Sequence, residues 1–186
     1  MLGSRTVQDI FYGGAGPDVM RGFAGGDHLY GEGGADLVVG GPGVDLIDGG
    51  TENDTLDGGD DADTVYGGPN DDTISGGSGD DLLLGEDGAD VIVGEDGNDS
   101  IYGGADADQI RGHSGDDYIE GNEGDDQICP GVGHNDEAYG NGGEDQIYDS
   151  AGNNDTVDGG TNDDVCINTG HDFLSGCENM ISTCPF

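Results

Sequence analysis

The chain has 186 residues, of which 42 are Asp or Glu and only three are Arg, with no Lys, so its formal net charge is −39. Leu, Ile, Val and Phe account for only 35 of the residues, and such a chain has too little apolar surface to fold unaided. The charge excludes nucleic acid and anionic membrane surfaces as partners, and no run of about 18 apolar residues could span a membrane. Cations are the natural partners.

Residues 1–12 are predicted to form an N-terminal capping unit. Residues 4–12, SRTVQDIFY, have an Asp and an apolar residue at the spacing of the repeat that follows but lack its glycines, as a terminal repeat should. The start, MLGSRTVQDIFYGG, has no basic region followed by an apolar stretch, so it does not resemble a secretory signal peptide. A removed signal, another export route and an artificial start all remain open.

Residues 13–129 consist of thirteen consecutive nine-residue units, such as GGSGDDLLL at 76–84. The first place is Gly, the sixth is Asp and the eighth is apolar in every unit. The sixth-place residues are Asp18, Asp27, Asp36, Asp45, Asp54, Asp63, Asp72, Asp81, Asp90, Asp99, Asp108, Asp117 and Asp126. One unit supplies a single apolar side chain, so the units must stack to bury a continuous core.

Each unit is predicted to form a six-residue turn followed by a three-residue strand. Glycines at the first, second and fourth places permit positive φ and close approach of the backbone. At the fourth place Asp61, Asn70 and Asp106 tolerate that conformation, whereas Glu52 fits it less well. The last three residues form the strand, with the eighth-place side chain pointing inward.

The unit resembles GGxGxDxUx, the Ca²⁺-binding repeat of RTX (repeats-in-toxin, haemolysin-type) proteins, and the resemblance covers residues 13–167. It implies an all-β fold, a right-handed parallel β-roll (β-solenoid) with two nonapeptides, 18 residues, per turn and about eight to nine turns in this chain. It also implies Ca²⁺ between successive turns, bound by the Asp of one unit, the Asp eighteen residues on and nearby carbonyl groups. Ca²⁺ is therefore the expected cofactor, on the order of ten or more ions.

Stacking of turns about 4.8 Å apart would place the sixth-place aspartates in two ladders, one along each edge. Two carboxylates about 5 Å apart repel by roughly 0.8 kcal/mol in water and by about 3 kcal/mol at an effective dielectric constant of 20. Over eleven neighbouring pairs in residues 13–129, this repulsion rivals the stability of a domain. A hard dication with oxygen ligands turns each repulsive pair into a bridge. The chain is therefore expected to fold on binding Ca²⁺, with Mg²⁺ a poor substitute.

Residues 130–167 are predicted to continue the roll irregularly. Pro130 is interpreted as one extra residue before GVGHNDEAY, and DSAGNNDTVD at 149–158 again contains one extra residue. Asp136, Asp145 and Asp164 join the predicted metal ligands. Residues 168–186 are predicted to form a C-terminal cap.

All four cysteines, Cys129, Cys166, Cys177 and Cys184, lie in the last 58 residues. Of the three possible pairings, Cys166 with Cys177 and Cys129 with Cys184 is favoured over a buried free thiol at Cys166. Bacterial RTX proteins exported by the type I route are usually poor in cysteine. This cluster therefore favours a self-contained secreted protein with a disulfide-bonded cap.

The sequence gives little support for a zinc site or for a catalytic site. His28, His113, His134 and His171 occupy unrelated places of the repeat, so isolated surface histidines are favoured over zinc ligands. The motifs HExxH, GxSxG and GxxxxGK[ST] are absent, and a rod of turns offers no cleft for a pair of catalytic carboxylates. No catalytic residue is predicted, and no enzyme activity is expected.

The outward ninth place of alternate units forms a predicted tyrosine column. It contains Tyr12, Tyr30, Tyr66, Tyr102 and Tyr139, interrupted by Asp48, Leu84 and Glu120. We interpret the column as aromatic side chains that shield a thin sheet; weak self-association or contact with glycans is the alternative.

The predicted function is Ca²⁺ binding by a secreted, extracellular or cell-surface β-roll that acts as a structural or binding module. Two alternatives remain. The chain could be a repeat segment of an extracellular adhesin, or the repeat tail of an RTX toxin or secreted hydrolase whose effector domain is missing from this sequence.

Overall fold

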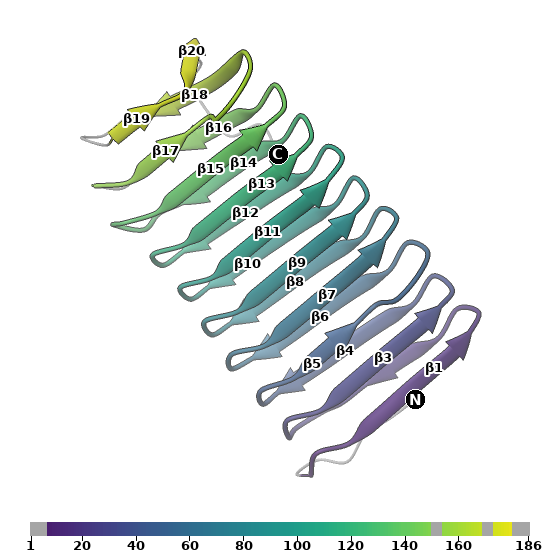
Figure 1. Cartoon of the computed structure of the whole chain (residues 1–186). Coiled ribbons are helices and arrows are strands. Elements are labelled where there is room, and N and C mark those ends of the chain that lie inside the picture. The colour runs from purple at the N-terminus through teal and green to yellow at the C-terminus, as the bar shows by residue number, and fades with distance from the viewer. Residues whose placement is uncertain (1–6, 150–153, 169–172, 180–186) are drawn as a thin grey trace.

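The computed structural model describes residues 7–149, 154–168 and 173–179, and these ranges contain twenty β-strands in two ten-stranded parallel sheets, with no helix (Figure 1). One sheet contains the odd-numbered strands β1 (Ile10–Ala15), β3 (His28–Gly33), β5 (Leu46–Asp48), β7 (Thr64–Pro69), β9 (Leu82–Asp87), β11 (Ser100–Ala105), β13 (Tyr118–Glu123), β15 (Glu137–Gly142), β17 (Thr156–Asp158) and β19 (Phe173–Ser175). The other contains β2 (Val19–Arg21), β4 (Leu37–Pro42), β6 (Thr55–Asp60), β8 (Thr73–Ser78), β10 (Val91–Asp96), β12 (Gln109–Ser114), β14 (Gln127–Gly131), β16 (Gln146–Asp149), β18 (Asp164–Asn168) and β20 (Cys177–Asn179).

The chain alternates between the two sheets, so each turn contributes one strand to each. Strands of one sheet pair at a spacing of eighteen residues; Val65 pairs with Leu83, and Ile92 with Ile110. Figure 1 shows the turns stacked like rungs from the N-terminal to the C-terminal end. The predicted all-β parallel solenoid with two nonapeptides per turn is confirmed, with about nine turns.

The core is a column of eighth-place side chains between the two sheets. Each is at most 1% exposed, and the column runs from Met20 through Ile128 and on through Ala138, Ile147, Val157 and Cys166. Each turn therefore buries only two such side chains. A core this thin provides little hydrophobic stabilisation for each ordered turn, so other interactions must help to hold the stack together.

The strands are longer than predicted. Twelve of the twenty have six residues and run from the seventh place of one unit to the third place of the next, as β8 does. The pairing of β6 with β8 continues beyond the predicted strand through Gly59 with Gly77 and Asp60 with Ser78. Turns that stack in register bring the backbone groups of these places opposite one another, and pairing satisfies their hydrogen bonds.

The glycines of the repeat have two different roles. The second and fourth places have positive φ, as in Gly77 and Gly79, which glycine adopts at least cost. Within residues 13–129 the first-place glycines do not have positive φ, contrary to the prediction. Their role is steric, because a Cβ on Gly85 would lie 2.3 Å from Asp90 Oδ2 and 2.5 Å from the carbonyl oxygen of Gly103.

The spacing is nineteen residues in the pairings of β13 with β15, β14 with β16, β15 with β17 and β16 with β18; Ile128 pairs with Ile147, for example. Pro130 is not the extra residue, because His113 pairs with Gly131 at the regular spacing, which leaves Pro130 in the first place. The insertion follows Gly133, where the Asn135 side chain donates a hydrogen bond of 2.8 Å to Asp116 Oδ2. The predicted insertion exists, but it lies within the turn.

The predicted C-terminal cap contains two further strands. β19 pairs with β17 and β20 with β18, so both sheets continue beyond residue 168. Cys166 and Cys177 form a disulfide, as predicted. The predicted partner of Cys129, Cys184, lies outside the described residues. No helix in the described part of the chain is long and apolar enough to cross a membrane.

Candidate metal centre

The sixth-place aspartates stack in two ladders, because each turn repeats the backbone path of the turn before it. The backbone N–H of each Asp donates a hydrogen bond to Oδ1 of the Asp one turn later, as from Asp72 to Asp90 at 2.7 Å. Sixteen such bonds of 2.6–3.0 Å link the ladder from Asp9 to Asp155 and the ladder from Asp18 to Asp164. One carboxylate oxygen of each Asp thus joins two turns.

The second oxygen, Oδ2, is buried and accepts no hydrogen bond from the described residues in most of these aspartates. The fifteen concerned are Asp27, Asp36, Asp45, Asp54, Asp63, Asp72, Asp81, Asp90, Asp99, Asp108, Asp117, Asp126, Asp136, Asp145 and Asp164. Asp18, near the N-terminal end, is only half-buried. A buried carboxylate oxygen without a partner is costly, so each of the fifteen requires a proton or a cation.

Burial raises the pKa of thirteen of these carboxyl groups, which run along the two ladders from Asp36 to Asp145. Desolvation is the largest cause; it raises the pKa of Asp90 to about 6 and those of Asp63 and Asp108 to about 8, although the hydrogen bond from the preceding Asp lowers each of them. For Asp108, the carboxylates of Asp126 and Asp90 raise the pKa further. At neutral pH the carboxylates of the ladders are therefore stabilised by any cation that can bind between the turns.

Backbone oxygens complete the surroundings of Oδ2. A Cβ on Gly94 would lie 2.2 Å from Asp99 Oδ2 and 2.8 Å from the carbonyl oxygen of Gly112. The same arrangement recurs at Gly76 with Asp81 Oδ2 and the carbonyl oxygen of Gly94. The invariant first-place glycine thus leaves carboxylate and carbonyl oxygens facing a space that any other residue would occupy.

Comparison with known protein families agrees with this arrangement. The model of the RTX calcium-binding nonapeptide repeat (4 copies) matches residues 8–38, 39–74, 66–101, 93–128 and 102–135. The chain belongs to this family. No match to a curated protein was found.

The oxygen atoms along the RTX ladders are suitable ligands for Ca²⁺, the cation that the family binds. Every buried side-chain atom named above that could coordinate a metal is a carboxylate oxygen, and hard oxygen ligands are those that Ca²⁺ prefers. Within the described ranges no three His, Cys, Asp or Glu side chains gather as a metal-binding group. Each gap between turns offers two carboxylates, so carbonyl groups must supply most of the six to eight ligands of a Ca²⁺ ion.

All sixteen predicted aspartates lie in the ladders, and the structure adds two more. Asp9 starts one ladder, and Asp155, which the sequence analysis missed, continues it by accepting a hydrogen bond of 3.0 Å from the Asp136 N–H. The local pattern could have identified Asp155. It stands two residues before the buried Val157, the same offset that separates every sixth-place Asp from its core residue.

The histidines do not form a second metal site in the described part of the chain. His28 contacts the Gln8 side chain at 3.1 Å, and the backbone N–H of His134 donates a hydrogen bond to Asp116 Oδ1. His171 lies outside the described residues.

Proposed function

We propose that the RTX repeats of this chain bind Ca²⁺ between successive turns and fold as they bind it. The observation that carries the proposal is the set of fifteen buried Oδ2 atoms without a hydrogen-bond partner among the described residues. The proposed ligands are the ladder aspartates from Asp9 to Asp164 together with carbonyl oxygens of the turns.

The number of ions follows from the number of gaps. Sixteen hydrogen-bonded Asp pairs join successive turns, and each pair borders one possible site, so on the order of ten or more Ca²⁺ ions bind. Each ion contacts two turns, and binding at one gap therefore orders the backbone of the next.

The biological role that fits this chemistry is a Ca²⁺-dependent structural or binding module without an enzyme activity of its own. It would act outside the cell, where Ca²⁺ is abundant enough to keep it folded. The disulfide between Cys166 and Cys177 supports this location, because disulfides persist in oxidising compartments. Detection of the folded protein in the medium or on the surface of the producing cells tests this part.

Circular dichroism and small-angle scattering during a Ca²⁺ titration test the binding proposal. In EGTA we expect an expanded chain without β signal, and with Ca²⁺ a β-rich rod; Mg²⁺ at the same concentration should fail to produce it. A β signal that is the same in EGTA and in Ca²⁺ would falsify the proposal.

A matched pair of triple variants identifies the ligands. Asp72, Asp90 and Asp108 are successive members of one ladder, and their replacement by Asn should abolish binding of several ions and raise the Ca²⁺ midpoint of folding. Asp60, Asp87 and Asp96 are exposed third-place residues, and the same replacement there changes the net charge equally. The second variant should keep the wild-type ion count.

A further inference from the structure

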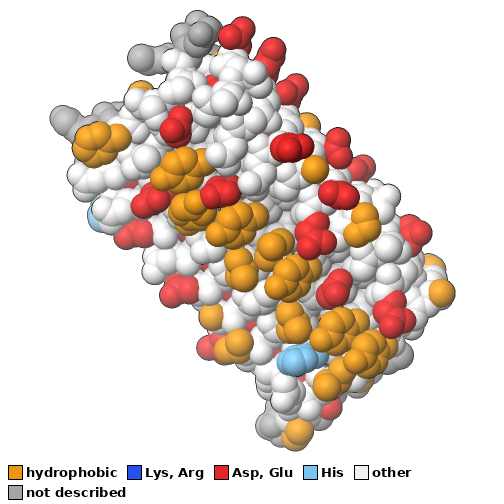
Figure 2. All heavy atoms as spheres, in the orientation of Figure 1, with side chains coloured by type: hydrophobic (Ala, Val, Ile, Leu, Met, Phe, Trp, Pro, Cys, Tyr) orange, Lys and Arg blue, Asp and Glu red, His pale blue; other side chains and the backbone are white. Residues whose placement is uncertain are grey.

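The outer face of the odd-numbered sheet carries six of the seven tyrosines of the chain. The six are Tyr12, Tyr30, Tyr66, Tyr102, Tyr118 and Tyr139. The predicted ninth-place column exists, since Tyr12 pairs with Tyr30 and Glu120 with Tyr139, and Figure 2 shows hydrophobic side chains gathered in a band along this face. Tyr118, which the column did not include, lies at a seventh place.

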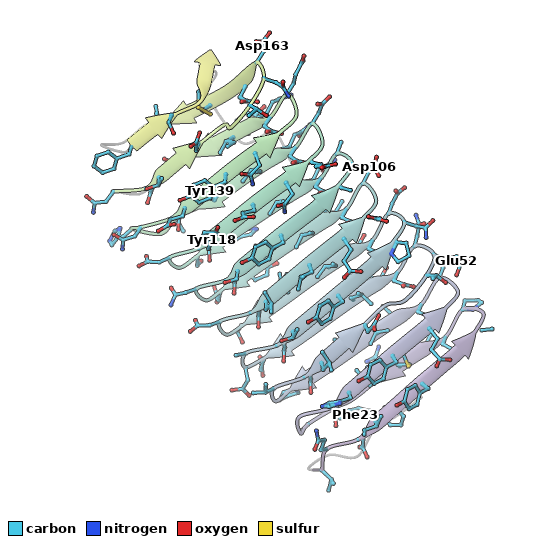
Figure 3. All side chains as sticks on the ribbon, viewed as in Figure 1. Phe23, Glu52, Asp106, Tyr118, Tyr139 and Asp163 are labelled. Carbon is cyan, nitrogen blue, oxygen red and sulfur yellow. A yellow bond between two sulfur atoms is a disulfide. The ribbon has the colours of Figure 1, made fainter. Side chains whose placement is uncertain are left out.

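Three of these rings surround one carboxylate. Tyr102 and Tyr139 lie on the strands that flank β13, and Glu120 stands between them in the ninth-place column. The Tyr118 ring lies 6.0 Å from that of Tyr102 and 5.6 Å from that of Tyr139, tilted by 52° and 45°. Figure 3 shows Tyr118 and Tyr139 on neighbouring rungs of the same face.

Two of the three hydroxyl groups of the cluster are held by carboxylates. Tyr118 donates a hydrogen bond to Glu120 Oε1, and Tyr139 donates one of 3.1 Å to Glu137 Oε2. Tyr102, Tyr118, Glu120 and Tyr139 are all half-buried. Each ring of the cluster is therefore partly open to solvent, and two of the hydroxyl groups are fixed by carboxylates.

No positive side chain of this face balances that charge. The outward seventh and ninth places of the described odd-numbered strands contain no Lys or Arg, and Arg21 and Arg111 lie on strands of the other sheet. Ring faces attract cations that lie within about 6 Å of their centroids. Aromatic rings around a carboxylate are the combination that recognises an alkylated ammonium group, which has no strong hydrogen bonds to satisfy.

From this geometry we propose that Tyr102, Tyr118, Tyr139 and Glu120 form a surface site for an organic cation that carries a quaternary ammonium group. The cation rests over the ring faces, and the Glu120 carboxylate balances its charge. A neutral ligand of the same shape gains only the apolar contact, and a hydrated metal ion gains little from the rings. The site is separate from the Asp ladders, which lie along the turns.

The same sheet contains a natural comparison. Asp48 stands in the ninth-place column between Tyr30 and Tyr66, but the seventh place of its strand is Leu46, where β13 has Tyr118. That position therefore has a carboxylate and two flanking rings without the third ring that contacts both of the others. Removal of Tyr66 is the matched control.

Titration of the full chain with choline chloride in saturating Ca²⁺ tests the site. Binding is measured by calorimetry and by tyrosine fluorescence, which can be observed because the chain has no Trp. We expect saturable binding in the millimolar range against a background of equal NaCl, and markedly weaker binding of the neutral isostere 3,3-dimethylbutan-1-ol. Tyr118→Leu and Glu120→Gln should each lower the affinity about twofold to fivefold, while Tyr66→Leu leaves it unchanged. Co-sedimentation with phosphatidylcholine vesicles distinguishes a lipid headgroup from a free ligand.

Equal binding of choline and its neutral isostere, or equal loss in the Tyr66→Leu variant, would overturn the inference and leave only an apolar patch. Circular dichroism of each variant in Ca²⁺ and in EGTA shows separately whether Ca²⁺-dependent folding is intact. The proposed Ca²⁺ function and the cation site can therefore fail independently.

Discussion

The eighteen-residue turns of residues 13–129 and the nineteen-residue turns after them reach the same fold by different means. In a regular turn, Asp90 Oδ2 lies against Gly85, the first residue of its unit. In the first irregular turn, the carboxylate of Asp136 lies instead against Gly133, with Oδ1 2.3 Å from the position that a Cβ would occupy. Pro130 can stand in the first place there because the inserted residue has moved the carboxylate away.

The comparison separates what the solenoid requires from what it tolerates. Pairing between β14 and β16 is limited to Gln127 with Gln146 and Ile128 with Ile147, whereas β6 and β8 form five such pairs. The Asp ladder nevertheless continues through both irregular turns at 2.9–3.0 Å. The buried apolar column and the stacked carboxylates thus persist through both regions, and the first-place glycine is replaced only where an inserted residue has moved the carboxylate away.

The largest effect is expected from a side chain at a regular first place. Gly85→Ala would place a Cβ 2.3 Å from Asp90 Oδ2 and 2.5 Å from the Gly103 carbonyl oxygen, and overpacking of this kind costs about 1–3 kcal/mol or more. We expect a clear rise in the Ca²⁺ midpoint of the β signal. The control Pro130→Ala keeps a Cβ that the irregular turn already accommodates and should change the midpoint little; equal effects would mean that the two turns do not differ.

A smaller effect is expected when one rung of a ladder loses its charge. Asp90→Asn and Asp155→Asn remove one carboxylate from a regular and an irregular turn. Asp90 belongs to two hydrogen-bonded Asp pairs, and Asp155, at the end of its ladder in the described residues, belongs to one there. Because the ladder is continuous through both regions, each variant should lose one or two bound Ca²⁺ ions, measured by equilibrium dialysis. An unchanged ion count in Asp155→Asn alone would restrict the metal sites to the regular turns.

The metal-free chain should depend on pH in the direction set by the raised pKa values. The folded-state pKa is about 6 for Asp90, about 7 for Asp72 and about 8 for Asp63, above the ordinary value of about 3.9 for an unfolded chain. Protonation therefore stabilises the fold below about pH 4, and this contribution is lost as the pH rises through about 6 to 8.

Circular dichroism of the chain freed of Ca²⁺ with a chelating resin should accordingly show more β structure at pH 5 than at pH 8. In Ca²⁺ the order is reversed, since protons compete for the same oxygens and Ca²⁺ affinity falls as the pH decreases. More β signal at pH 8 than at pH 5 in the metal-free samples would show that carboxylate repulsion does not limit the metal-free fold.

The smallest effect on Ca²⁺ binding is expected at the end of the irregular region. The disulfide between Cys166 and Cys177 joins residues only eleven apart, and closure of so short a loop contributes about 3 kcal/mol or less. The double variant Cys166→Ser with Cys177→Ser should leave the ion count of the regular turns unchanged. Hydrogen exchange should increase around β18 and not around β8; a general increase would show that the stack is cooperative along its whole length.

Sequence reasoning predicted the parts of the structure that repeat. The inward eighth place follows from a period of nine with one apolar residue, because such a unit has a single way to bury its side chain. The two sheets and the stacked aspartates follow from the resemblance of this unit to the RTX repeat. It placed the insertion wrongly at Pro130 and omitted Asp155. The first error arose because a one-residue insertion has no position in the sequence until the backbone shows which residues pair across the turns. Asp155 could have been found from its place two residues before the core residue Val157.

The amino-acid sequence by itself determined the core residues and the demand for cations, since these depend on composition and period, and its resemblance to the RTX repeat predicted the class of fold. Only the tertiary structure decided that the first glycine acts by making room for an oxygen, that strands extend into the turns, and that Tyr118 joins Tyr102 and Tyr139 around Glu120. These features depend on which residues become neighbours when rungs eighteen or nineteen residues apart are stacked, and no local stretch of the chain contains that information.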